Sequence, residues 1–176
     1  MATPLGHGLA GAIICLGCRR VGWQAPSMAA AVIVANLPDA DFLPGILVGW
    51  PSRYHHGASH SIVAAMICAL AIGIWSAAGK HHPTPARAGI LLGVCYLSHV
   101  IIDYFTVDTG TAVGIPVFWP FSHDLFIAPH PIFGDVKRDN FFDLAILRHD
   151  LWNLVIESAV FLPLFLLLHH AARRKP

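Results

Sequence analysis

The sequence predicts an all-α, polytopic membrane protein built from about four to five apolar helical segments. Hydrophobic residue types make up 56% of the 176 residues, and charged types make up only 12%. An average soluble domain has about 25% charged residues, so this chain has too few charges to cover a water-facing surface. It also contains uncharged runs of about 20 residues, which are long enough to cross a bilayer as helices. The length suits one domain, which we take to be residues 1–176.

The first two apolar segments are short. Residues 4–18 form an apolar run that is interrupted by His7, and residues 27–37 form a second run that ends at Pro38. Neither run has the roughly 20 residues of a full span, so we expect a tight or half-depth helical hairpin. Residues 38–60 are rich in Pro, Gly, Asp and His, and this composition is typical of a loop.

Three later segments are long enough to span a membrane. Residues 61–79 carry no charge, and residues 88–105 are apolar except for His99 and Asp103 near their end. Residues 151–169 form the last apolar run. The intervening residues 106–150 are predicted to be a long loop, with a short helix near residues 140–148.

The basic residues predict an orientation, because short cytoplasmic loops of membrane proteins carry an excess of Lys and Arg. With the spans above, seven basic residues fall on one side and four on the other. The larger set is Arg19, Arg20, Lys80, Arg87, Arg173, Arg174 and Lys175, and the smaller set is Arg53, Lys137, Arg138 and Arg148. We therefore place the larger set in the cytoplasm, so that the loops 38–60 and 106–150 face outward.

Two function classes are disfavoured by composition. The formal net charge is +1 and no run of Lys or Arg is long enough to follow phosphates, so we expect no nucleic-acid partner. Cys15 and Cys18 have the CxxC spacing of a redox pair or half a zinc site. There is no second CxxC, and both cysteines lie in an apolar segment of small residues, so we interpret them as packing residues.

Histidine is unusually frequent, with 12 residues against 11 Lys and Arg. Four His or Asp clusters fall at the predicted outer end of the segments, although the orientation was derived from Lys and Arg alone. They are His7, Asp39 with Asp41, His55 with His60, and His99 with Asp103. We interpret the remaining histidines near these segments, His56, His81, His82, His169 and His170, as surface or interface residues.

The pair His99 and Asp103 is the most informative. Residues four apart share one helix face, with Cβ atoms about 5–6 Å apart. A charged residue at the centre of a membrane helix costs roughly 2.5–3.5 kcal/mol, so such a pair needs a compensating partner. A metal ion can bind imidazole and carboxylate together. The alternative is a His–Asp hydrogen bond that joins two helices.

These motifs resemble the YdjM-type family of inner-membrane proteins, to which metal-dependent hydrolysis is ascribed. The family pattern has a His near the N-terminus, then PDxD, HRGxTHS-like, HxxxD and PFS elements. The matching residues, along residues 1–123, are His7; Pro38, Asp39 and Asp41; His55, Gly57, Ser59, His60 and Ser61; His99 and Asp103; and Pro120, Phe121 and Ser122. His56 stands in place of the Arg and Ser59 in place of the Thr. More remotely, the order of the clusters is similar to zinc-dependent phospholipase C, a helical multi-metal phosphodiesterase.

The clusters and the resemblance together imply a membrane-bound metal-dependent hydrolase with its site at the outer membrane surface. The predicted ligands of one or two divalent ions, with zinc favoured by the His and Asp donors, are His7, Asp39, Asp41, His55, His60, His99 and Asp103. The predicted base is Asp41 or Glu157. Glu157 shares a helix face with Asn153 and His149, and its alternative role is to lock helices together by hydrogen bonding.

The implied substrate is a phosphoester or a lipid-borne molecule, and the implied partners are membrane lipids and a small-molecule or lipid substrate. The alternative is a membrane metal-binding or transport protein without hydrolytic activity. Residues 61–79 and 88–98 contain no acidic residue or His, which disfavours transport, because a transport path needs polar groups deep in the spans.

The orientation can be tested directly. We expect the turn at residues 80–87 and the C-terminus to face the cytoplasm, because they carry most of the basic residues. A reporter enzyme that is active only outside the cytoplasm should be inactive when fused to the C-terminus. A Thr84→Cys variant should resist a membrane-impermeant thiol reagent in intact cells. Reporter activity, or labelling of residue 84 from outside, would contradict this orientation.

Overall fold

The computed structural model describes residues 2–49, 54–80, 82–109, 113–137 and 143–173. Within these ranges every regular element is a helix, and β-structure is limited to two isolated bridges, Thr106 with Phe133 and Ile115 with Phe126. The predicted all-α class is therefore confirmed. Both bridges lie in the long segment between α5 (Pro85–Tyr104) and α6 (Leu144–Arg173).

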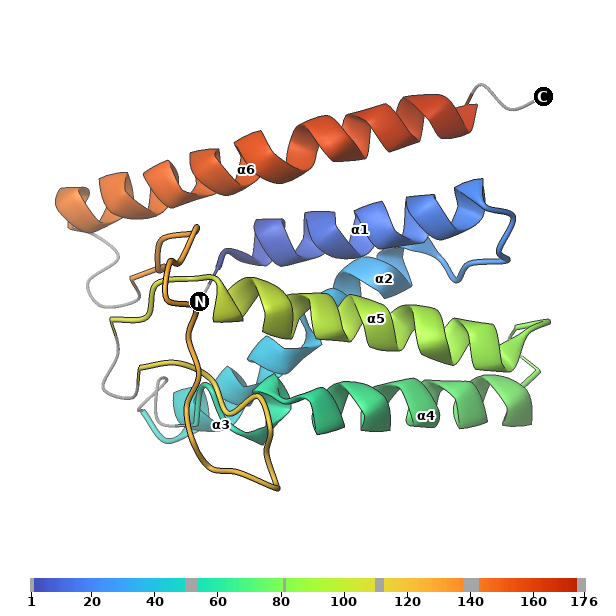
Figure 1. The fold of residues 1–176 in the computed structure, drawn as a ribbon, viewed down its shortest axis with the longest axis horizontal. Helices are drawn as coiled ribbons and strands as arrows, with labels where there is room; N and C mark the ends of the chain where they lie inside the picture. Colours follow the sequence, from blue (N-terminus) through green and yellow to red (C-terminus); the bar gives the residue numbers. More distant parts are fainter. Residues whose placement is uncertain (1, 50–53, 81, 110–112, 138–142, 174–176) are drawn as a thin grey trace.

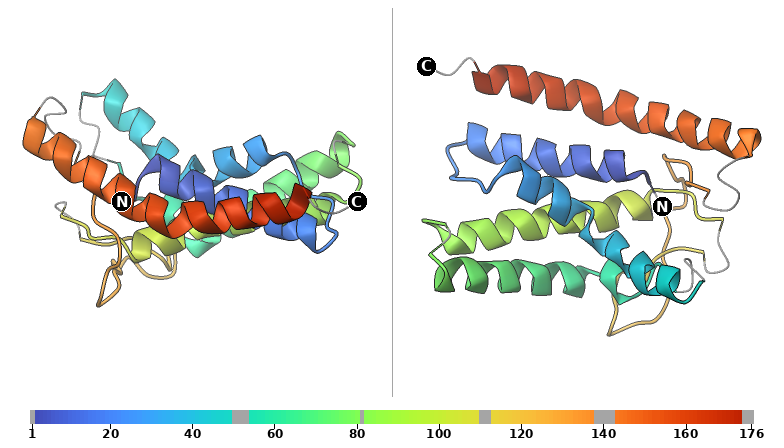
Figure 2. Two further views of the ribbon diagram at one scale, coloured as in Figure 1. Left: turned by 90° about the horizontal axis from the view of Figure 1, so that it is seen from above. Right: turned by 180° about the vertical axis from the view of Figure 1, so that it is seen from behind.

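Four long helices lie side by side with nearly parallel axes (Figure 1). They are α1 (Pro4–Arg20), α4 (Ile62–Ala78), α5 and α6. Helix α5 packs against both α4 and α1, and α6 packs against α1. A bent segment, α2 (Met28–Ala35) followed by η1 (Leu37–Asp41) and α3 (Phe42–Leu47), crosses the bundle obliquely (Figure 2). This crossing carries residues 39–41 from the side of α1 to the start of α4.

The predicted N-terminal helical hairpin is present as α1 and α2, which pack against each other. Each helix has a side-chain N-cap: the Thr3 hydroxyl accepts from Gly6 N at 3.1 Å, and the Ser27 hydroxyl accepts from Ala30 N at 3.1 Å. The two helices approach closely at Gly11, where a Cβ atom would lie 2.6 Å from the Ala31 carbonyl oxygen. Only glycine fits this contact.

The prediction of a loop over residues 38–60 is wrong for its first part, because η1 and α3 continue the helical path as far as Leu47. Pro38 and Pro44 suggested a break, but both lie in the first turn of their helices. First-turn amides have no intrahelical partner, so a proline there costs no hydrogen bond. The axis bends by 51° between α2 and this segment.

Two helices, α5 and α6, are long and apolar enough to cross a membrane, and the bent α2–α3 segment is a third candidate if it counts as one span. Helix α4 is apolar but has only 17 residues. The structure thus supports two to three candidate membrane spans. The expectation of four to five apolar helical segments in the membrane stays a prediction.

Helix α6 corrects the expected boundary of the last span. Its 30 residues begin at Leu144, so residues 144–148 are its first turns rather than part of a separate short helix. The expected start of that short helix at residues 140–142 lies outside the described residues. Residues 144–148 therefore extend the apolar helix that follows them, without a break.

The described basic residues are divided between the two ends of the bundle as predicted. The end at which α1, α4 and α6 finish carries Arg19, Arg20, Lys80, Arg87 and Arg173, and the opposite end carries Lys137 and Arg148. Arg53, Arg138, Arg174 and Lys175 lie outside the described residues. Which end faces the cytoplasm stays a prediction.

The four cysteines are free, as expected for packing residues. Cys15 of α1 and Cys95 of α5 are fully buried in the same apolar core, together with Ala31 and Leu91. The Cys95 thiol contacts the Gly11 carbonyl at 3.8 Å. The interpretation of Cys15 as a packing residue is therefore confirmed.

The close contact between α4 and α5 gives a stability prediction. A Cβ atom at Gly89 would lie 2.5 Å from the Ala69 carbonyl oxygen, whereas one at Gly17 would meet nothing within 4 Å. Gly89→Ala should lower stability by about 1–3 kcal/mol, since the helix backbones must move apart. Gly17→Ala, the matched control, should be neutral or stabilising by up to about 1 kcal/mol, because Ala favours the helix. Equal unfolding temperatures of the two variants in detergent would contradict the packing.

Candidate metal centre

The seven predicted ligands lie at one end of the bundle and come from four parts of the chain. They are His7 on α1, Asp39 and Asp41 on η1, His55 and His60 in the turn before α4, and His99 and Asp103 in the last turns of α5. The side chains of His7, His60, His99 and Asp103 have no exposed surface, while those of Asp39, Asp41 and His55 are 10–14% exposed. The centre thus has a dry interior and a side that is open to solvent.

Four of these residues, Asp39, His60, His99 and Asp103, form what we call the inner group. Each offers one ligand atom, and these atoms lie within 4.8 Å of one another. His99 Nε2 lies 3.2 Å from His60 Nε2, 3.1 Å from Asp103 Oδ2 and 3.5 Å from Asp39 Oδ1. His60 Nε2 lies 3.4 Å from Asp103 Oδ2 and 3.7 Å from Asp39 Oδ1. Ligands at the usual zinc distances occupy tetrahedral corners about 3.3–3.6 Å apart. Five of the six separations in the inner group are therefore close to those of a tetrahedral metal site.

Hydrogen bonds hold both imidazoles of the inner group in the metal-binding tautomer. His99 Nδ1 donates to the Ala35 carbonyl at 2.8 Å. His60 Nδ1 lies 3.0 Å from the Ser59 hydroxyl, which itself donates to Asp41 Oδ2 at 2.9 Å. A proton on each Nδ1 leaves each Nε2 with a lone pair directed at the other ligands, as in metal-bound histidines.

The buried polar atoms of this region also fit a cation. Both carboxylate oxygens of Asp39, Asp103 Oδ2 and both ring nitrogens of His7 are buried without a hydrogen-bond partner among the described residues. Burying a carboxylate in this way is costly unless a cation or several donors compensate it. Two imidazole nitrogens and two carboxylate oxygens are a normal donor set for a divalent metal ion. The residues therefore fit a metal ion.

His7 lies beside the inner group rather than within it. Its ring stacks on that of His99, with centroids 3.6 Å apart, and its Nε2 lies 3.4 Å from Asp103 Oδ1. The same carboxylate oxygen accepts a hydrogen bond from Ala2 N at 3.0 Å. His7 is thus brought to the centre as predicted, and whether it binds the metal itself stays a prediction.

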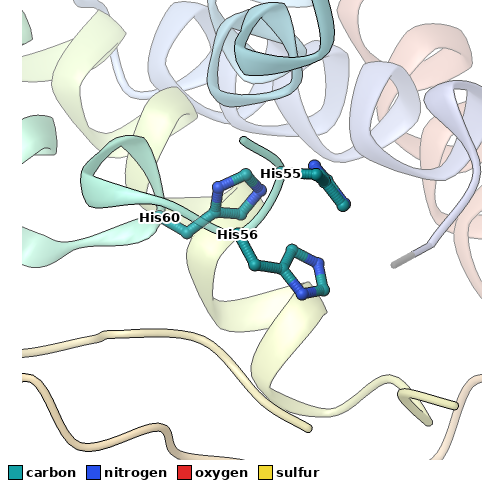
Figure 3. A group of neighbouring side chains, drawn as sticks. All are labelled: His55, His56 and His60. Atoms are coloured by element: carbon teal, nitrogen blue, oxygen red, sulfur yellow. The ribbon is translucent and has the colours of Figure 1, made fainter. Parts of the chain in front are cut away.

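His56 was predicted to be a surface or interface residue, and this interpretation is wrong. Its side chain is only 11% exposed, and its Nδ1 donates to Asp108 Oδ2 at 3.1 Å. Its ring centroid lies 4.0 Å from that of His55 and 5.0 Å from that of His60 (Figure 3). The only sequence signal for a role of His56 was that it stands in place of the Arg of the family pattern. Asp108 was missed as the partner of His56, because it lies in the long loop after α5.

His55 completes this more exposed part of the centre. Its Nδ1 donates to Asp41 Oδ1 at 3.0 Å, and its ring stacks on Phe42. Burial lowers the pKa of His55 to about 4, even though the bond to Asp41 acts in the opposite direction. The imidazole is therefore neutral at pH 7, which is the form that binds metal ions.

Glu157 is buried, but it belongs to none of the metal-binding groups found in the described residues. Thr3 N donates to Glu157 Oε1 at 2.9 Å, and the Thr3 hydroxyl also donates to this carboxylate. On the same helix face, Asn153 Nδ2 and His149 Nε2 donate to the Asp135 carbonyl at 2.6 and 3.0 Å. This face joins α6 to the N-terminus and to the loop, and the role of Glu157 as a base stays a prediction.

The PFS element of the predicted pattern lies apart from the centre. Phe121 is 88% exposed, and the Ser122 hydroxyl donates to the exposed Asp124 carboxylate at 2.8 Å.

The apolar helices and the buried His and Asp residues at one end of the bundle define a helical membrane protein with a candidate metal centre. A family model described as YdjM inner membrane protein matches residues 1–175, so the chain belongs to this family. The resemblance predicted from the motifs is thereby confirmed. No curated protein and no solved structure matches the chain. The remote similarity to zinc-dependent phospholipase C stays a prediction.

Substitutions of His99 and Asp103 separate a metal site from a structural hydrogen bond. If the inner group binds metal, His99→Ala and Asp103→Ala should each remove the metal ion of the inner group while the protein still inserts, because residues 88–97 are apolar. If the pair only joins helices, His99→Ala should destabilise by about 1–3 kcal/mol, because the buried Asp103 Oδ2 loses its nearest partner, and the double variant should regain stability.

The measurements are metal content by mass spectrometry and thermal unfolding of the purified protein. His170→Ala is the control, because His170 is exposed near the opposite end of α6. Unchanged metal content, with an instability that the double variant repairs, would show that the pair is structural.

Proposed function

We propose that this protein is a membrane-bound metal-dependent hydrolase, with a phosphoester or lipid-borne substrate. The observation that carries the proposal is the inner group, in which four ligand atoms from three separate segments come within 4.8 Å of one another. Membrane helices rarely bury ionisable residues without a functional reason. Here two carboxylates and two imidazoles, with His7 beside them, are collected at one end of an apolar bundle.

Zinc is the ion that the donor set favours. Two imidazole nitrogens with carboxylate oxygens in tetrahedral arrangement are typical of zinc, whereas magnesium and calcium take oxygen ligands in larger numbers. When bound, zinc lowers the pKa of water towards about 7 and polarises the scissile bond. The protein's own contribution is to fix the tautomers of His60 and His99 and to keep their nitrogens dry.

Asp41 is the better candidate of the two predicted bases. It lies at the open side of the centre, where its oxygens accept from His55 Nδ1 at 3.0 Å and from the Ser59 hydroxyl at 2.9 Å. Each carboxylate oxygen has a second lone pair, so Asp41 can still accept a proton. The Glu157 carboxylate accepts from Thr3 N. This bond favours a role for Glu157 in positioning the N-terminal segment.

A lipid-borne substrate is supported by an apolar groove beside the centre. The groove has a volume of about 370 Å³. Three of its lining residues lie close in the chain to metal-centre residues: Ile62 is two residues after His60, Val100 follows His99, and Tyr104 follows Asp103. The full lining is Ile62, Leu97, Val100, Ile101, Tyr104, Phe105, Val117, Phe118 and Phe126. An acyl chain in this groove would leave its headgroup close to the centre.

The proposed placement is multi-pass in the inner membrane, with the metal centre on the extracytoplasmic side. The family is described as an inner membrane protein, and the positive-inside rule supports this side. A centre at headgroup depth also suits a substrate that arrives within the lipid leaflet.

The alternative is a metal-binding or transport protein without hydrolysis. A closed set of four protein ligands is typical of structural zinc sites, and this favours the alternative if the inner group acts alone. Transport is disfavoured, because α4 and the first part of α5, as far as Ser98, contain no acidic residue or histidine.

The function is tested with the purified protein in lipid nanodiscs, against a panel of phosphodiesters and phospholipids. We expect turnover of at least one lipid phosphoester, its loss after chelation, and its return with zinc, because the metal supplies the water activation. His99→Ala should be inactive, while His170→Ala should keep the activity of the unmodified protein. Tight metal binding without turnover of any panel member would favour the alternative.

A further inference from the structure

We propose that the centre has a second cation site at its open side, which we call the outer site, formed by His55 and His56 and completed by the Asp39 carboxylate. This inference rests on the proposed metal centre and deepens it. His56 is the new element, because it departs from the motif of the family pattern and was expected to lie at the surface.

The two imidazoles are prepared in the same way. His55 Nδ1 donates to Asp41 at 3.0 Å, and His56 Nδ1 donates to Asp108 at 3.1 Å. The other nitrogen of each ring, Nε2, is buried and has no hydrogen-bond partner within the described residues. A histidine that gives its N–H to a carboxylate and keeps a free lone pair on the second nitrogen is the usual arrangement of a metal ligand.

The outer site is continuous with the inner group. His55, His56 and His60 offer ring nitrogens within 4.8 Å of one another (Figure 3). Asp39, Asp41 and His55 form another such set, so Asp39 belongs both to this set and to the inner group. Both oxygens of Asp39 are buried without a hydrogen-bond partner in the described part of the chain. A carboxylate with two free oxygens can serve one ion with each of them.

The backbone at His56 supports a specific placement of its ring. His56 has φ of +60°, a left-handed conformation that is uncommon for a residue other than glycine or asparagine. Asp108, which holds the ring, also accepts from Gly114 N at 2.9 Å, so the loop after α5 is tied to the turn before α4. A residue with an uncommon backbone conformation, whose ring is held by a residue 52 positions away in the chain, fits a functional role better than a surface position.

The outer site would supply an open coordination position, which the inner group lacks because it already offers four protein ligands. The inner group offers four protein ligands, whereas the outer site offers the imidazoles of His55 and His56, with the Asp39 carboxylate grouped with His55. Catalytic zinc sites keep such an open position, and paired ions suit the charge of a phosphoester. The side chains of His55 and His56 are 10% and 11% exposed, so both rings border the open side of the centre, while their Nε2 atoms are buried.

The test is the metal content of purified protein after equilibration with zinc and removal of loosely bound ions. The unmodified protein should hold about two equivalents, and His99→Ala should keep about one. Two variants of His56 should each lose about one equivalent. His56→Asn tolerates the left-handed backbone, and His56→Arg keeps a donor for Asp108 but has no lone pair to bind a metal.

The control is His123→Ala, because His123 is an exposed histidine of the loop after α5 and lies in none of the metal-binding groups. It should keep about two equivalents. Two equivalents in both His56 variants would overturn the outer site. A single equivalent in the unmodified protein and none in His99→Ala would also overturn it, and would leave the inner group and the proposed hydrolysis intact. Two ions without turnover of any lipid or phosphodiester would instead keep the outer site and remove the proposed function.

Discussion

The structure depends on the compensation of one buried negative charge, the carboxylate of Asp103. Its oxygens lie 3.1 to 3.4 Å from His99, His60 and His7, and one of them accepts a hydrogen bond from Ala2 N. A carboxylate in this environment is stable only if donors or a cation surround it. The segments before α1 and before α4 and the end of α5 therefore meet at this point. The same requirement that fixes the fold at this end of the bundle brings together residues that could hold a metal ion.

Close packing of small residues makes this meeting geometrically feasible. Gly11 lets α1 and α2 approach until the Ala31 backbone fills the space of a side chain, and Gly89 does the same for α5 and α4. The close approach of α2 to α5 also brings the Ala35 carbonyl within 2.8 Å of His99 Nδ1. In this way the backbone of one helix sets the tautomer of a ligand on another. Larger side chains at these glycines would separate the helices and weaken the ligand geometry.

The sequence was sufficient to predict those parts that depend on local pattern. Uncharged runs predicted α4 and α5, and the four-residue spacing of His99 and Asp103 predicted their common face. The helical course of residues 37–47 was missed, because a proline in a first turn has the same sequence signature as a proline in a loop. Asp108 as partner of His56, and Thr3 as partner of Glu157, were missed for a different reason. These pairs join residues 52 and 154 positions apart, and no local pattern specifies such contacts.

The two carboxylates of η1 show how a short motif can serve two layers of one site. Asp39 lies 3.5 Å from His99 Nε2 and 3.7 Å from His60 Nε2, on the side of the ligand atoms. Asp41 instead lies on the Nδ1 side of the imidazoles, 3.0 Å from His55 and 3.3 Å from His60. The first carboxylate thus faces the Nε2 atoms of the inner group, whereas the second contacts the opposite nitrogens of the histidine rings. The two aspartates of the PDxD element are therefore not interchangeable, although the sequence presents them as equivalent.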